Sequence, residues 1–149
     1  MLSSLPPQAH GDAFFETVAV RGLASTAIER GDLASAHALL LETVTLSRRV
    51  QNATVDYPTV LGYFARLAAA EDQPERALRL AGAAAALRQA AGTHPFRHDH
   101  ELLEWRLDQV QRVLSAEAAA AASVEGQAMA LEDALAYAVA PGARPVLGP

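Results

Sequence analysis

The 149-residue chain contains no cysteine and no lysine, so all twelve of its basic residues are arginine. Without cysteine there are no disulfides and no thiolate metal sites. Without lysine there is no lysine Schiff base and no phosphate-binding loop that ends in Gly-Lys. Aromatic residues make up only 5% of the chain, and no apolar run approaches the roughly 20 residues of a membrane helix. Its first residues do not resemble a signal peptide. These features favour a soluble, cytoplasmic protein.

What the chain has in abundance is alanine, at 34 positions, and leucine, arginine and glutamate are also frequent. These residues are strong helix formers, and β-branched runs are nearly absent. The composition therefore predicts an all-α fold. The formal net charge of −5 and the pI near 5.5 disfavour direct binding to nucleic acid.

Glycine and proline separate the apolar, helix-period segments and so predict where helices begin and end. Gly31 suits a left-handed C-terminal cap, Asp32 and Ser115 suit N-caps, and Pro58 and Pro74 suit first turns. Six to seven helices are expected, over residues 13–30, 33–50, 58–70, 74–91, 99–114, 115–128 and 131–138. We expect residues 1–12 and 141–149 to be flexible and residues 13–140 to form a single domain.

An internal repeat appears when the sequence is shifted by 41 positions. The pairs that coincide are Val20 and Leu61, Leu23 and Phe64, Ala24 and Ala65, Ala27 and Ala68, Ala36 and Ala77, Leu40 and Ala81, Thr43 and Ala84, and Leu46 and Leu87. Small residues recur where two antiparallel helices must approach closely, and larger ones recur where the next pair would stack. The shift therefore predicts two equivalent helical hairpins.

This pattern resembles the tetratricopeptide repeat, whose first helix carries a small residue midway and whose second carries a small, large, small series. Those roles fall to Ala24 and Ala65, then to residues 36, 40 and 43, and to residues 77, 81 and 84. The resemblance implies a right-handed stack of antiparallel hairpins, a TPR-like α-solenoid. We expect two regular hairpins, a less regular pair and a short terminal helix.

A narrower resemblance covers Asp72 to Ala90 (DQPERALRLAGAAAALRQA), Val124 to Met129 and Leu131 to Ala138. These segments are similar to the C-terminal helical-repeat region of large bacterial LuxR-type and ATPase-containing transcriptional regulators. The resemblance implies a non-catalytic module that binds a protein partner or a neighbouring domain, with a homodimer as a further form of partnership. The alternative is a sensor that binds a small-molecule effector in its concave groove. No cofactor and no membrane partner is expected.

The repeat resemblance also implies which residues face the groove, because the first helix of each pair forms the inner wall of such stacks. Arg21 and Ser25 from one hairpin, and Gly62 and Arg66 from the next, are the candidate groove residues. Substitution of Arg21 and Arg66 by alanine should weaken partner binding if this assignment is right.

His94, His98 and His100, with Asp99 and Glu101, form the one dense cluster of ligand-type residues. A metal there would need three or four convergent ligands, and a polar loop with Asp99 as a helix cap is the favoured interpretation. No serine lies in a nucleophile elbow, and the acidic pairs suit solvated helix faces. We therefore expect a protein that is not an enzyme, with no catalytic and no metal-binding residue.

Two further expectations concern side-chain packing. Leu103, Leu107, Val110 and Leu114 form a helical stripe that should pack on the preceding hairpin. Trp105, the only tryptophan, should anchor the core or a helix seam. The arginine pairs, including Arg76 and Arg79, should lie on a solvated, ion-paired face.

Overall fold

The computed structural model describes residues 7–49 and 56–140, which form seven α-helices and no strand, so the all-α prediction is confirmed. The helices are α1 (Pro7–Arg30), α2 (Leu33–Arg49), α3 (Tyr57–Ala70), α4 (Pro74–Ala91), α5 (Arg97–Val113), α6 (Ala116–Gln127) and α7 (Leu131–Val139). In the described ranges, none of these helices combines the length and apolar character that crossing a bilayer requires.

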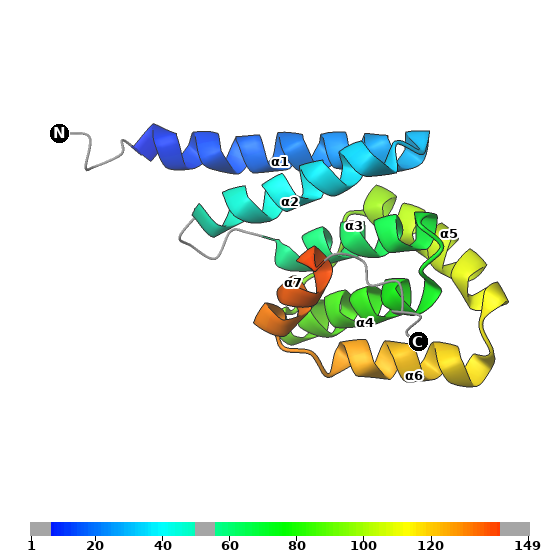
Figure 1. Ribbon diagram of the computed structural model, residues 1–149. Coiled ribbons are helices and arrows are strands. Elements are labelled where there is room, and N and C mark those ends of the chain that lie inside the picture. Colours follow the sequence, from blue (N-terminus) through cyan, green and yellow to red (C-terminus); the bar gives the residue numbers. More distant parts are fainter. Residues whose placement is uncertain (1–6, 50–55, 141–149) are drawn as a thin grey trace. The chain divides into compact units, whose positions relative to one another are not determined.

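The contacts divide the chain into two compact units, Met1–Asp56 and Tyr57–Pro149. The N-terminal unit contains the α1–α2 hairpin, whose antiparallel helices lie side by side (Figure 1). Its seam is made of small or medium side chains, among them the fully buried Ala24, Ala36 and Leu40. The single domain expected over residues 13–140 remains a prediction.

The first helix begins at Pro7 rather than at the expected Ala13. Proline is favourable in the first turn of a helix because the amide hydrogen that it lacks would have no intrahelical partner there. Residues 7–12, which we expected to belong to a flexible segment, are therefore helical. The expected tail from Pro141 and most of the expected loop between the hairpins lie outside the described residues.

The two predicted hairpins turn in the same way, 41 residues apart. Gly31 and Asp72 both adopt a left-handed backbone, with φ of 79° and 59°. The amide that follows each of them, at Asp32 and at Gln73, donates to the carbonyl of Ala27 or of Ala68 at 2.9 Å. The amides of Ala36 and Ala77 then donate to the carbonyls of residues 32 and 73 at 3.0 Å. The repeat thus exists as two hairpins with one turn geometry.

In the C-terminal unit the α3–α4 hairpin is surrounded by the three helices that follow it. The next helix, α5, packs mainly against α3, and α6 packs mainly against α4, running in the same direction as α4 (Figure 1). The short α7 contacts both α3 and α4. Although a turn of two residues joins α5 and α6, these two helices do not pack along their length. The expected less regular pair is therefore a splayed one.

Glycine lets α4 and α6 approach until their backbones touch. A Cβ atom at Gly82 of α4 would lie 2.5 Å from the carbonyl oxygen of Ser123 in α6. A Cβ atom at Gly126 of α6 would overlap the backbone of Arg79 in α4. Since each helix contributes a glycine opposite the backbone of the other, the contact is reciprocal and fixes the register of α6 on α4.

Two arginines of α4 hold α7 and α6, where we had expected a solvated face. Arg76 Nη2 donates to the carbonyl oxygens of Tyr137, Ala138 and Ala140 at 2.9, 2.9 and 3.0 Å, and its guanidinium lies 4.7 Å from the centroid of the Tyr137 ring. A cation placed at the C-terminus of a helix also complements the helix dipole. The guanidinium of Arg76 therefore anchors the end of α7.

The second arginine, Arg79, lies between α6 and α7. Its Nε donates to Glu125 Oε1 at 2.7 Å, and its Nη1 donates to the Tyr137 hydroxyl at 3.3 Å. The hydrogen bond to Glu125, followed by that to Tyr137, raises the pKa of Arg79 above its ordinary value. Arg79 is therefore ion-paired as expected, but its partner comes from a neighbouring helix of the unit.

The buried face of α5 matches the predicted stripe as far as Val110, whereas Leu114 is the half-buried residue that follows the helix at its C-cap. Leu107 and Val110 are buried. Leu103 faces Gly62 of α3, since a Cβ atom added at Gly62 would lie 3.7 Å from Cδ2 of Leu103. The prediction for Trp105 is wrong: its side chain is 54% exposed, and the neighbouring Arg106 lies 5.2 Å from its ring centroid. Two residues of α-helix correspond to a rotation of about 200°, so position 105 faces away from Leu107.

Candidate functional site

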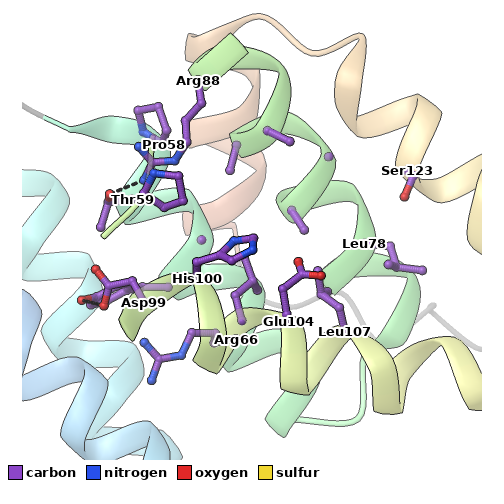
Figure 2. Close-up of a pocket in the computed structure, with 18 of the residues that line it drawn as sticks. Pro58, Thr59, Arg66, Leu78, Arg88, Asp99, His100, Glu104, Leu107 and Ser123 are labelled. Carbon is purple, nitrogen blue, oxygen red and sulfur yellow. Dashed lines mark hydrogen bonds between the residues drawn. The ribbon is translucent and has the colours of Figure 1, made fainter. Parts of the chain in front are cut away.

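A cavity of about 490 Å³ lies inside the C-terminal unit. Its walls come from α3, α4, α5, α6 and the loop between α4 and α5. It exists because α5 and α6 rest on different helices of the α3–α4 hairpin and are not packed against each other along their length. We call this cavity the α5–α6 cleft, and Figure 2 shows it from close up.

The floor of the cleft is apolar and consists mainly of small side chains. Leu78, Ala81 and Ala85 are spaced by three and four residues along α4 and so share one side of that helix. Gly62 of α3 and Leu107 of α5 continue the apolar surface. Since most of these side chains are small, the backbone of α4 is within reach of a bound molecule.

Several polar groups on the walls are engaged with other parts of the protein. The Tyr63 hydroxyl donates to Asp99 Oδ1 at 2.8 Å and so ties α3 to α5. Arg88 of α4 donates from Nη2 to the Thr59 hydroxyl of α3, as the dashed line in Figure 2 marks. These interactions shape the walls, and they orient one carboxylate and one guanidinium toward neutral partners.

The centre of the cleft is flanked by two polar side chains of α5, His100 and Glu104, which lie one helical turn apart and both reach over the cavity (Figure 2). Both are exposed, and Glu104 has no hydrogen-bonding or ionic partner within residues 7–49 and 56–140. Glu104 is therefore a charged group on the wall of the cleft that is left for a bound molecule.

The cleft continues between the ends of α5 and α6. A second hollow of about 400 Å³ is lined by Gln111 and Ser123, which also line the first cavity, and by three alanines of α6. Those alanines are Ala116, Ala119 and Ala120. The two hollows together make an elongated depression rather than an enclosed chamber, and this shape suits an extended or helical occupant.

The four predicted groove residues divide between the two units. Gly62 and Arg66 of α3 line the α5–α6 cleft, and Arg66 is buried with its guanidinium 5.0 Å from the Tyr63 ring centroid. Arg21 and Ser25 are half-buried residues of α1 in the N-terminal unit. Arg66 extends away from His100 and Glu104 in Figure 2, so it supports the wall more than it faces the centre of the cleft.

The histidine cluster does not assemble into a ligand set. His94 and His100 line the cleft, whereas His98 is exposed and lies off its lining. No group of three or more His, Cys, Asp or Glu side chains converges within the part of the chain that the structure describes. Asp99, expected as the cap of the fifth helix, lies in the first turn of α5 and accepts the hydrogen bond from Tyr63. The N-cap position belongs to Phe96.

The residues of α4 and α6 that complete the cleft were not predicted as site residues. The α5 wall carries a periodic signal, because residues 100, 104, 107 and 111 share one face of the helix. The α6 wall carries none, since α6 is almost uniformly small and apolar. Comparisons with protein-family models, with curated proteins and with solved structures found no match.

Proposed function

We propose that this chain is a non-catalytic interaction module of a bacterial regulatory protein, and that it binds a protein partner or a neighbouring domain through the α5–α6 cleft. The observation that carries the proposal is the splaying of α5 and α6 over the α3–α4 hairpin. Paired helices normally cover their apolar faces with each other, whereas here Ala81 and Ala85 of α4 stay accessible at the cleft, beside the buried Leu78 and Leu107.

The polar groups of the cleft support binding more than catalysis. General acid–base catalysis needs titratable groups placed within reach of a reacting atom. Asp99 and Arg88 are instead bound to Tyr63 and Thr59, where they join helices. An elongated, largely apolar depression between helices suits recognition of an amphipathic segment.

A selection experiment tests this function. A displayed library of amphipathic helical peptides, about 14 residues long so as to follow α4 from Leu78 to Gln89, is selected on the full chain. Binders should lose affinity about tenfold or more for an Ala85→Trp variant, since the indole fills the floor of the cleft. The control is Ala90→Trp, because Ala90 is exposed on the same helix but lies off the cleft lining. Binders that tolerate both variants equally would contradict the proposal.

A small-molecule effector is the second candidate, and the size of the cavity favours it. A volume of about 490 Å³ lies within the range of roughly 300–1,000 Å³ that is typical of small-ligand pockets. The apolar dye 8-anilinonaphthalene-1-sulfonate is a suitable probe. Saturable binding of one dye per chain, abolished by Ala85→Trp and retained in Ala90→Trp, would support this function. Equal binding to both variants would count against it.

A further inference from the structure

Four side chains with a full charge line the α5–α6 cleft, and three of them are used by the protein itself. Arg88 donates to Thr59, Asp99 accepts from Tyr63, and Arg66 lies over the Tyr63 ring. Glu104 is the fourth, and it has no ionic or hydrogen-bonding partner among the described residues. The partners of the two arginines are neutral, so both guanidiniums keep their positive charge and the lining carries two charges of each sign. The charged group that extends over the centre of the cleft, beside His100, is nevertheless the carboxylate of Glu104 (Figure 2).

Glu104 is placed where an occupant of the floor would pass. It lies on α5 between Leu103 and Leu107, and its carboxylate extends over the cavity beside His100 (Figure 2). A molecule that covers Ala81 and Ala85 would bring its flank alongside this carboxylate. A neutral or acidic flank there would leave Glu104 unpaired in a partly desolvated position, which is unfavourable.

The floor favours a helix as the occupant. Leu78, Ala81 and Ala85 form a stripe along one side of α4, and the accessible part of this stripe, at Ala81 and Ala85, is of the small, apolar kind against which another helix can pack. On its adjacent side α4 already accepts α6 at backbone contact through Gly82. The small side chains at positions 81 and 85 allow a similarly close approach on the side of the cleft.

We infer that the partner segment is a basic amphipathic helix, whose apolar stripe covers Ala81 and Ala85 and whose lysine or arginine pairs with Glu104. This inference rests on the proposed function and adds the chemistry of the partner to it. The ion pair would mainly set specificity, because charged pairs at the rim of an interface contribute more to selection than to affinity.

The experiment uses pairs of peptides from the selection, identical except for lysine or glutamate at the flanking position, with affinity measured on the full chain at pH 8. This pH is above the range in which imidazole ordinarily titrates. The lysine peptide should bind on the order of fivefold more tightly at low salt, the upper end for an exposed ion pair. Glu104→Gln should abolish the preference, and Glu104→Arg should reverse it.

Asp108→Asn is the matched control, because Asp108 is an exposed carboxylate of the same helix that lies off the cleft lining. It should leave the preference for lysine unchanged. Peptides that Ala85→Trp blocks but that show no charge preference, or a preference insensitive to Glu104→Gln, would overturn this inference and leave the proposed function standing. A selection that yields no peptide sensitive to Ala85→Trp would overturn the proposed function itself, and the inference with it.

Discussion

The α1–α2 and α3–α4 hairpins share one turn geometry but differ at the positions where α3–α4 contacts its neighbours. Tyr63, which ties α3 to α5, corresponds to Gly22 in the N-terminal hairpin after the shift of 41 residues. Arg76, which holds α7, corresponds to Ser35, and Gly82, which admits α6, corresponds to Leu41. The turn is thus encoded locally, while a few contact positions decide what can be added to a hairpin.

Burial follows the same division. Ten consecutive residues of α3, from Thr59 to Ala68, are buried. In α1, large apolar side chains remain on the surface: Phe15 is 70% exposed and Leu23 is 59% exposed, although Phe64, the counterpart of Leu23, is only 3% exposed. Equivalent positions in a repeat therefore need not be equally buried. A comparison of exposed fractions alone would not have revealed that the two hairpins share one turn geometry.

The largest effect that separates the hairpins should come from two helical glycines, Gly22 within the first hairpin and Gly126 of α6, which packs against the second. Gly126→Ala places a methyl group against the backbone of Arg79, and we expect a loss of about 3 kcal/mol in the free energy of unfolding. Gly22→Ala should instead stabilise α1 by about 0.5–1 kcal/mol, because a Cβ there meets nothing within 4 Å. Urea denaturation followed by circular dichroism and by Trp105 fluorescence measures both. Equal effects of the two substitutions would contradict the backbone contact between α4 and α6.

A smaller effect is expected when α7 loses its anchor. Arg76→Met removes the hydrogen bonds to three carbonyls and should cost about 2 kcal/mol, as is typical of hydrogen bonds to charged groups. In the Arg76→Met variant, amide hydrogen exchange in α7 should be faster than in the unmodified chain, while exchange in α2 should be unchanged. Arg112→Met, at an exposed arginine of α5, is the control and should leave exchange in α7 unchanged. Unaltered protection of α7 in the Arg76 variant would show that apolar packing alone holds it.

The bond between α3 and α5 should contribute less. Tyr63→Phe deletes the hydroxyl that donates to Asp99 and should cost about 1 kcal/mol in the free energy of unfolding. Because this hydrogen bond joins α3 to α5 and Trp105 lies on α5, a change in Trp105 fluorescence would report a displacement of that helix. Tyr57→Phe, at the start of the same helix, is the comparison variant. A stability equal to that of the unmodified chain would mean that α5 is held by Leu103, Leu107 and Val110.

The last two effects concern the shared turn and should be no larger than that of Tyr63→Phe. Gly31→Ala should destabilise the first hairpin by about 1 kcal/mol, because a left-handed backbone is costly for a residue with a Cβ. Asp72→Gly should stabilise the second hairpin, because glycine adopts a left-handed backbone without a steric penalty. The gain should be only about 0.5 kcal/mol, since aspartate tolerates this conformation better than most residues. Thermal unfolding of both variants measures the two shifts. Changes of the same sign would show that the turns are not energetically equivalent.

Local features of this chain were predictable from its sequence. Gly31, Pro74 and Ser115 announce helix boundaries because caps and first turns depend on only a few adjacent residues, and the Ser115 hydroxyl does accept from the Ala118 amide at 3.0 Å. The stripe of Leu103, Leu107 and Val110 likewise predicted which face of α5 is buried. Each of these signals is complete within one or two helical turns.

The cleft was not predictable, for two physical reasons. Nearly every face of α6 is small and apolar, so its sequence does not show which side meets α4. Gly82 and Gly126 are 44 residues apart, and neither reveals the other as its counterpart until both helices are placed. Trp105 was predicted wrongly for a different reason. Its burial was predicted from the apolar character of the indole, whereas its position two residues before Leu107 places it on the exposed side of α5.

The reciprocal glycine contact has a consequence for how the cleft could accommodate partners of different width. Because the main chains of α4 and α6 meet at two points, sliding α6 by even one residue would bring side chains into collision with the opposing backbone. The contact of α5 with α3 instead runs through side chains that can change rotamer, such as Leu103 against Gly62. Adjustment to a wider or narrower ligand therefore falls to α5 alone, the helix that carries Glu104.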